Sequence, residues 1–512
     1  MAQFGKKLAE AKIWLKPNME TLQRTANRGS VSTGYDIDNS VKLEADNVEF
    51  MDRVISSTGN RKTWTHSSWV KRTEISFAGD GFGHTFFMGG AYGSEGCLLR
   101  FNTGTTAATL DTLQIDIGDG GTQNRSHTSQ VFRDTSAWYH IVLAVDTTQS
   151  TATDRFKLYV NGELVTSYYS RNNPTQNLDT GNNYQSSGYY NNVGAYKSGG
   201  TTYGKFCGYI AESYNIDGSA LAPTAFGEFD EDSGIWKPKE YTGSFPNNSW
   251  YLKFDDSGAL GADSSGNSHT FTLTNIAAAD QATDSPTNSF CTLNPLFAGF
   301  QSTVQLPLNG ATQYGVSGGN QDLSYAGTMG VTKGKWYFEN YINEVVSTYG
   351  ARIYVGFHTF QQDYDGVQVG ASTNGDALAV WQMDAGNYIA WNGGSRSVTG
   401  SLGAVDSNGA GKFVGIALNL DDNQISFYYD GSAVTNGSNL ALYNMGTQTD
   451  AGIFAIPVVQ TKGSIQTANF GGYIPSNFIA SAATDANGYG TFEFAPPTGY
   501  YALCTKNLAE YG

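Results

Sequence analysis

Cysteine, histidine and charged side chains are scarce in this chain of 512 residues. The four cysteines, Cys97, Cys207, Cys291 and Cys504, have no short spacing between them, which argues against a zinc site and against a dense disulfide framework. We therefore expect free and mostly buried thiols. The six histidines show neither an HExxH pattern nor another spacing typical of metal ligands, so the sequence predicts no metal site from them.

Long apolar runs and an excess of positive charge are also missing. No stretch of about 18 apolar residues occurs, so the sequence predicts no membrane insertion. Lys6, Lys7 and Glu10 interrupt the apolar run that a signal peptide would need, so synthesis in the cytoplasm without a signal peptide is expected. The net charge of −16 argues against a nucleic-acid partner, because binding to phosphates needs a basic surface.

Glycine and aromatic residues are abundant instead, with 62 Gly, 31 Tyr and 28 Phe. Glycine supplies the turns and aromatic side chains suit pleated faces, so this composition is typical of an all-β protein. Residues 138–162 and 411–431 each read as a strand, a turn and a strand, with an apolar residue at every second position. Such alternation indicates a sheet covered on one face, and the two units predict two antiparallel β-sandwiches.

The first sandwich is expected in residues 30–240. Its candidate strands are 41–43, 64–71, 85–88, 98–102, 113–117, 138–145, 155–160 and 205–214. In the first long strand, Trp64, His66 and Val70 fall on one face, and Trp69 and Lys71 on the other. The runs TWTHSSWVKR, WYHIVLAVD, KLYVNGELV and GYIAESYNIDG resemble a laminin-G-like, concanavalin-A-type jelly roll.

Residues 241–302 are expected to form an ordered bridge, in which the alternation of Trp250, Leu252 and Phe254 predicts a short strand paired with one of the sandwiches. The second sandwich is expected in residues 303–475, followed by a C-terminal segment, 476–512. The runs GKWYFE, IYVGF, GKFVGIAL, ISFYYDG and IPVV occur there in the order of the strands of a SPRY domain, which the second sandwich resembles.

Residues 1–29 carry a local net charge of +4 on an otherwise acidic chain. A short amphipathic helix is predicted before Pro17. Three interpretations stay open: a solvated terminus, an anchor that docks on a partner protein, and a helix that lies on a membrane surface. The candidate anchor residues are Lys6, Lys7, Lys12, Lys16 and Arg24.

The run SPTNSFCTLNPL lies between the two sandwiches, and the run ALCTKNL lies near the end of the sequence. Together with the two sandwiches, these runs resemble structural proteins of bacteriophages, marine ones especially. This resemblance implies a virion component, such as a tail fibre or another appendage of the tail or capsid. Its N-terminal segment would bind other virion proteins. The resemblance to fibres also implies a homo-oligomer, for which we expect a trimer.

Catalysis and ion binding find little support in the sequence. The laminarinase-like glycoside hydrolases resemble this fold and use a Glu-x-Asp-x-x-Glu strand, but here Gln114, Asp116 and Asp119 occupy those positions. Hydrolysis with retention needs two carboxyl groups about 5 Å apart, so we expect no enzyme activity. Asp116 with Asp119, or the acidic turn 230–234, could supply oxygen ligands to calcium. The sequence shows no complete set of calcium ligands, however, and no cofactor is predicted.

Binding has better support, because aromatic and amide side chains on loops suit sugars. The loop 182–192 carries Tyr184, Tyr189, Tyr190 and Asn191, although an intersubunit contact or a simple polar loop would explain it equally well. In the second sandwich, the candidates near loops are Tyr364, Asp365, Trp381, Trp391 and Asn392; the two tryptophans are also good candidates for the core.

The prediction is therefore a non-enzymatic virion surface protein whose sandwich loops recognise host surface glycans or proteins. Weak sites repeated on an oligomer would gain avidity through effective concentration. Two alternatives remain: a capsid decoration or head fibre protein with a structural role, and a depolymerase that cleaves surface polysaccharide.

Overall fold

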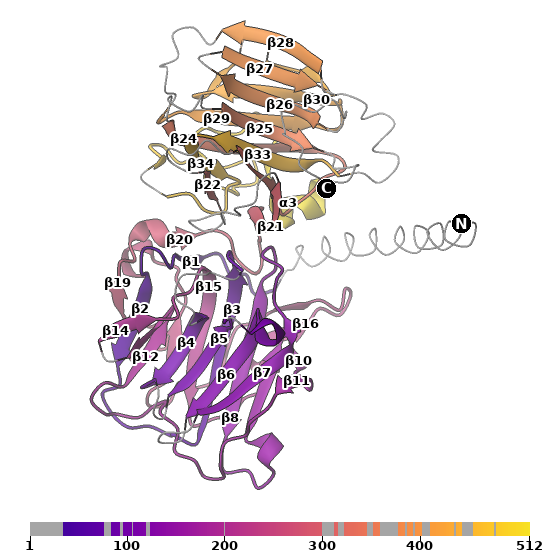
Figure 1. Cartoon of the computed structure of the whole chain (residues 1–512). Coiled ribbons are helices and arrows are strands. Elements are labelled where there is room, and N and C mark those ends of the chain that lie inside the picture. The colour runs from indigo at the N-terminus through magenta and orange to yellow at the C-terminus, as the bar shows by residue number, and fades with distance from the viewer. Residues whose placement is uncertain are drawn as a thin grey trace, which may run out of the picture.

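The protein forms two β-sandwiches that are stacked end to end (Figure 1). The computed structural model describes residues 34–75, 83–92, 96–104, 106–118, 123–198, 200–299, 312–315, 322–345, 352–358, 377–384, 387–392, 395–401, 410–434, 437–442, 454–475 and 478–512. The all-β expectation is confirmed, and α3 (Thr505–Tyr511) is the α-helix found in these ranges. Short 3-10 helices lie at Ala107–Thr109, Ala152–Asp154, Pro223–Ala225, Ser257–Ala259 and Ala278–Asp280.

The first sandwich consists of two antiparallel sheets, which we call the β3 sheet and the β6 sheet. The β3 sheet has the order β10 (Glu163–Leu164), β9 (Phe156–Val160), β8 (Tyr139–Asp146), β3 (Thr63–Arg72), β15 (Gly208–Asp217), β1 (Ser40–Leu43) and β20 (Gln281–Ala282), with β18 (Trp250–Leu252) also paired to β15. The β6 sheet has the order β11 (Tyr168–Ser170), β7 (Gln123–Val131), β6 (Thr112–Gly118), β5 (Cys97–Phe101), β4 (His84–Gly90), β12 (Tyr190–Val193), β2 (Phe50–Val54) and β19 (Thr272–Thr274).

The core of the first sandwich lies between these two sheets, and β3 shows why. Trp64 and Val70 are fully buried in the main apolar cluster, and the His66 ring stacks on Phe87 of the β6 sheet at 3.8 Å. Trp69 alternates with them and belongs to a second cluster on the outer face. The predicted division of β3 into two faces is therefore confirmed, as is the pairing of β8 with β9.

The segment 241–302, expected as a bridge, supplies strands to both sandwiches. The strand predicted from Trp250 and Leu252 is confirmed as β18, and β19 and β20 add to the edges of the first sandwich. Trp250 and Phe271 are buried in the first core. β21 (Leu293–Gly299) then begins the second sandwich by pairing with β23 (Asp322–Gly327).

The second sandwich also consists of two antiparallel sheets. One sheet has the order β21, β23 (Asp322–Gly327), β33 (Ile456–Lys462), β25 (Arg352–His358), β26 (Ala377–Asp384), β27 (Asn387–Asn392) and β28 (Ser395–Ser401). The other has the order β22 (Gln313–Gly315), β34 (Ser464–Asn469), β24 (Lys335–Val345), β29 (Phe413–Asn419), β30 (Gln424–Tyr429) and β31 (Ser432–Ala433), with β32 (Leu440–Ala441) paired to β30. The predicted hairpin 411–431 is confirmed as β29 and β30.

The C-terminal segment is built into the second sandwich and also contacts the first. β35 (Tyr501–Ala502) pairs in parallel with β24. The buried carboxylate of Glu339 accepts hydrogen bonds from the backbone N–H groups of Glu493 and Phe494, both at 2.9 Å. Lys506 of α3 lies 3.4 Å from Asp36, which precedes the first sandwich. The last residues of the chain thus help to hold the two sandwiches together.

Two further expectations concern thiols and membranes. All four cysteines lie within the described ranges, and each is a buried free thiol, as predicted. Within the described residues, no helix has the length and hydropathy that a membrane crossing needs.

Candidate functional site

A pocket of about 580 Å³ lies on the outer face of the β3 sheet, next to the junction with the second sandwich. A small hairpin, β16 (Gly227–Phe229) and β17 (Trp236–Pro238), forms one wall. The β9–β10 turn, the segment after β20 and the start of α3 complete it. The aromatic residues that line the pocket are Tyr35, Trp69, Trp138, Phe229 and Trp236, and its polar groups include Asp36, Asn161, Lys237, Thr287, Ser289 and Thr505.

Three stacked rings support the hairpin wall. His140 stacks on Trp69 with ring centroids 4.7 Å apart, and on Trp236 at 5.9 Å. The indole N–H of Trp236 donates to Nδ1 of His140 at 3.0 Å, so Nδ1 is unprotonated and Nε2 carries the hydrogen that Ser67 Oγ accepts at 2.9 Å. Burial lowers the pKa of His140 to about 3, which keeps this neutral tautomer at ordinary pH.

The rim of the pocket is aromatic as well. The Phe229 ring packs edge-on against Trp236 at 4.9 Å and remains 44% exposed. Gly162, in the β9–β10 turn, has φ +82, and a Cβ atom there would lie 2.3 Å from the Trp236 ring. Glycine is therefore needed at this position both for the backbone and for the close approach of the indole.

The floor of the pocket is fixed by a buried carboxylate from the segment between the sandwiches. Asp284 accepts a hydrogen bond from the indole N–H of Trp138 at 2.9 Å and one from Lys71 Nζ at 2.7 Å. Lys71 also donates to Ser289, which lines the pocket, at 3.1 Å. Burial raises the pKa of Asp284, and the two donors oppose that shift. Trp138 is thus held in one orientation by contacts that reach the start of the second sandwich.

A second buried carboxylate holds the Tyr35 wall. The Tyr35 hydroxyl donates to Oε2 of Glu212 at 3.1 Å, and the Tyr251 hydroxyl donates to Oε1 at 2.6 Å. Tyr214 also donates to Oε2 of Glu212. Glu212 has φ +47 at an irregularity of β15, a strained conformation for a residue with a side chain. The Glu212 carboxylate thus faces three tyrosine hydroxyls, and burial raises its pKa.

Comparison with protein families agrees with the fold of the first sandwich. Residues 43–201 match a laminin-G family model, described as the concanavalin A-like lectin/glucanases superfamily. This match spans β2 to β13 (Tyr196–Ser198), and the laminin-G-like expectation for this part of the chain is confirmed. No curated protein matches the chain.

Several solved structures are similar to the chain. A Bacteroides ovatus protein named for carbohydrate binding is 16% identical, with a TM-score of 0.33, and the match covers 47% of this chain and 60% of that one. The SPRY domain of human HERC1 is 21% identical, with a TM-score of 0.24, over 34% of this chain and 96% of that one. The LG4-5 domains of the mouse laminin alpha1 chain are 9% identical, with a TM-score of 0.27, over 93% and 88%.

The tyrosine loop predicted as a ligand site lies apart from the lining of this pocket. Tyr184 and Tyr189 are half-buried and pack edge-on at 5.1 Å, and the Arg61 guanidinium lies 3.8 Å from the Tyr184 ring. Tyr190 and Asn191 are not in a loop, because they begin β12 in the interior of the β6 sheet. Asn191 is fully buried: its amide donates to Asn182 and accepts from Trp250. A ligand on the surface cannot reach Asn191, so we leave it out of the binding proposal.

Three of the residues predicted in the second sandwich lie in its strands. Trp381 lies in the middle of β26, paired with Ala390, and Trp391 and Asn392 end β27. Tyr364 and Asp365 lie outside the described residues, as do the predicted anchor residues Lys6, Lys7, Lys12, Lys16 and Arg24.

Two of the carboxylates considered for catalysis or calcium, Asp116 and Asp230, are bound by protein partners. Asp116 accepts two hydrogen bonds from the Arg125 guanidinium, both at 2.9 Å, and one from Gln114 at 2.9 Å. Asp230 accepts from the Ser233 N–H at 2.9 Å and pairs with Lys237 at 3.2 Å; these contacts lower its pKa to about 2. Asp119 lies outside the described residues. Asp116 and Asp230 therefore have well-defined structural roles.

Proposed function

We propose that the chain is a non-enzymatic glycan-binding protein and that the pocket beside Trp236 is its binding site. The observation that carries this proposal is the Phe229 ring, 44% exposed at the rim and packed edge-on against Trp236. Sugars bind through C–H patches on aromatic rings and through hydrogen bonds from their hydroxyls to a few polar groups. The pocket offers both kinds of contact, and its volume suits a short oligosaccharide.

The charges around the pocket favour a neutral glycan. Asp36 pairs with Lys506, and Lys237 with Asp230, so neither sign dominates at the rim. The chain as a whole carries a net charge of −16 and repels polyanions. The paired carboxylate and ammonium groups can still bond sugar hydroxyls, because each has further acceptor or donor capacity.

Binding of the purified full-length protein to an array of neutral oligosaccharides tests this proposal. For a ligand found there, Phe229→Ala should weaken binding at least about fivefold, because an aromatic contact of this kind contributes about 1 kcal/mol. Tyr169→Ala is the matched control, since Tyr169 is a 57% exposed aromatic residue outside the pocket lining. Equal loss in both variants, or an array without any bound sugar, would contradict the proposal.

The biological setting that we propose is the surface of a bacteriophage particle, because the sequence resembles such proteins. The basic N-terminal segment would dock on other virion proteins, the assembled oligomer would be a trimer, and the repeated pockets would bind host glycans with avidity. Labelled protein should bind host cells saturably and block infection. A protein found on the capsid that never binds cells would favour the decoration role instead.

Absence of catalysis is part of the proposal. Its support is that Asp116, the carboxylate in the described strand Thr112–Gly118, is engaged by Arg125 and Gln114 and is not a free acid for glycoside hydrolysis. Incubation of the protein with any polysaccharide that it binds should release no new reducing ends. Release that disappears when one carboxylate is replaced by its amide would establish the depolymerase and overturn the proposal.

A further inference from the structure

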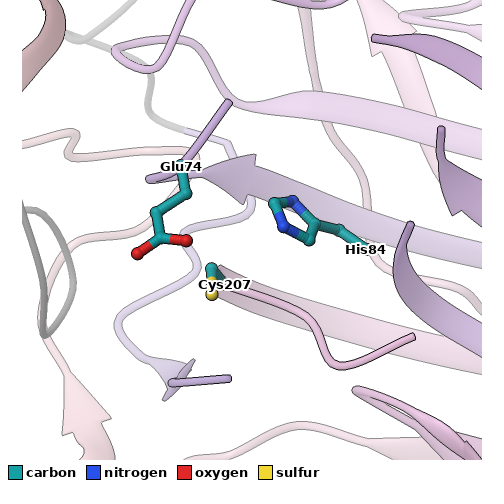
Figure 2. Close-up of side chains that lie close together, drawn as sticks. All are labelled: Glu74, His84 and Cys207. Carbon is teal, nitrogen blue, oxygen red and sulfur yellow. The ribbon is translucent and has the colours of Figure 1, made fainter. Parts of the chain in front are cut away.

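Three side chains with metal-ligating atoms meet inside the first sandwich: Glu74, His84 and Cys207 (Figure 2). Glu74 follows the end of β3, His84 begins β4 and Cys207 directly precedes β15. Their ligating atoms all lie within 4.8 Å of one another, and all three residues are buried. Because β4 belongs to the β6 sheet and the other two strands to the β3 sheet, the cluster joins the two sheets.

The Glu74 carboxylate is the group that most needs a partner. Glu74 is 1% exposed, and within the described residues no hydrogen-bond donor reaches its Oε2 atom. Figure 2 shows the carboxylate directed toward the Cys207 thiol, with the His84 ring on the other side of the sulfur. A buried carboxylate oxygen without a donor is costly, so an ion or a proton must satisfy it.

We propose that Glu74, His84 and Cys207 bind one divalent transition-metal ion of the Zn²⁺ type. One sulfur, one nitrogen and one oxygen donor are the set that Zn²⁺ accepts, whereas Ca²⁺ and Mg²⁺ prefer oxygen alone. In a tetrahedral zinc site the ligand atoms are about 3.5 Å apart, so small movements of the three side chains would close the site. Glu44, whose Oε1 lies 3.7 Å from the Cys207 sulfur, is the nearest candidate for a fourth ligand, and water is the alternative.

The charges at the cluster agree with a divalent cation. Glu74 and Cys207 are both buried, so a negative charge on either group needs a counter-ion close by. As ligands, the carboxylate and the thiolate together balance the charge of the ion. The nearby Arg72 is directed elsewhere, because it pairs with Asp111 at 3.0 Å and donates to the Phe132 carbonyl at 2.6 Å.

The ion would have a structural role. It would connect the end of β3 to the starts of β4 and β15, inside the sandwich whose outer face carries the aromatic pocket. This proposal does not depend on glycan binding, and each can fail without the other.

Titration of the full-length protein with Co²⁺, after removal of metal with a chelator, tests the site directly. Thiolate-bound Co²⁺ gives a charge-transfer band in the near ultraviolet, and we expect this band to saturate at one ion per chain. Cys207→Ser should abolish the band, and Glu74→Gln should weaken binding at least about 100-fold. Cys97→Ser is the matched control: it removes a buried thiol outside the cluster and should leave the band unchanged.

Circular dichroism shows whether each variant is folded. If Cys207→Ser fails to fold, Glu74→Gln still tests the site, because this substitution keeps the size of the side chain. A second readout is thermal melting: Zn²⁺ should raise the Tm of the wild type and of Cys97→Ser by several degrees, but not that of Glu74→Gln, and Ca²⁺ should not replace it. An absent cobalt band, a band that survives in Cys207→Ser, or equal effects of Zn²⁺ on the wild type and Glu74→Gln would overturn the proposal.

Discussion

The Nζ atom of Lys71 lies 2.7 Å from Oδ2 of Asp284, and both side chains are at most 1% exposed. This ion pair links the outer face of β3 to the segment that enters the second sandwich. The same carboxylate orients Trp138, so the pocket and the junction between the sandwiches depend on one buried contact.

Removal of one partner of this pair should be strongly destabilising. We expect Asp284→Asn to lower the free energy of unfolding by about 3–5 kcal/mol, because the Lys71 ammonium would stay buried without its counter-ion. Urea unfolding measures the effect. The exposed pair of Lys157 and Asp154 is the control, and Asp154→Asn should cost less than about 1 kcal/mol. Equal costs at the two positions would show that burial does not matter here.

The turn glycine Gly162 should tolerate no side chain. Gly162→Ala places a Cβ atom 2.3 Å from the Trp236 ring and should displace the indole from the pocket wall. Gly188 has nearly the same φ, +83, but no described heavy atom lies within 4 Å of the position that a Cβ atom would take there. Gly188→Ala therefore measures the backbone penalty alone, about 1 kcal/mol. Glycan binding should fall in Gly162→Ala and persist in Gly188→Ala. Unchanged glycan binding in both variants would show that Trp236 is not part of the binding site.

Two buried histidines should make the first sandwich sensitive to acid. Burial lowers the pKa of both His66 and His140 to about 3, below the value of about 6.5 in the unfolded chain. Between these values the unfolded state binds more protons, so each histidine lowers the stability by about 1.4 kcal/mol per pH unit as the pH falls below 6.5.

His140→Gln removes one of these protonation sites. Urea unfolding between pH 7 and pH 4 should therefore give a shallower loss of stability for this variant than for the wild type. His269→Gln is the control, because the His269 ring lies at the surface, in an exposed contact with the Asn247 carbonyl. Identical profiles of stability against pH for His140→Gln and the wild type would refute the prediction that His140 makes the sandwich sensitive to acid.

Deletion of residues 1–29 should leave both sandwiches folded. Among the described residues, the first buried apolar side chains of this sandwich are Ile37 and Val41, beyond the deleted segment. The Tm should stay within about 2 °C of that of the full chain, whereas incorporation into a particle should be lost if the segment is an anchor. Loss of cooperative melting in the shortened protein would show instead that the segment is part of the fold.

The fold can be predicted from the sequence further than the site can. Strands such as β3, β8 and β29 carry local alternation, which is visible in any short window. β7, with the sequence QNRSHTSQV, lacks this alternation and is missing from the predicted strands. The prediction of a loop at β12 is wrong because tyrosine and asparagine dominate that segment, although Asn191 and Asn192 are buried amides within a sheet. Composition alone does not distinguish a buried amide network from a polar loop.

The pocket and the cluster of Glu74, His84 and Cys207 are not visible in the sequence, because each joins distant segments. The alternation places Trp69 correctly on the outer face of its strand, but nothing in the sequence connects it with Trp236 or Phe229. The acidic turn 230–234, between Phe229 and Trp236, suggests only a calcium site. Likewise, His84 and Cys207 have no ligand spacing along the chain. Only the pairing of strands brings these side chains together.

Thr505 contributes to a pocket whose other walls come from residues 35–289. During synthesis the first sandwich can fold as soon as its own strands have left the ribosome, since domains generally fold as units from the N-terminal side. The pocket, however, is unfinished until α3 emerges and docks beside it. A nascent chain that stalls within the second sandwich would therefore display a folded first sandwich with an incomplete pocket.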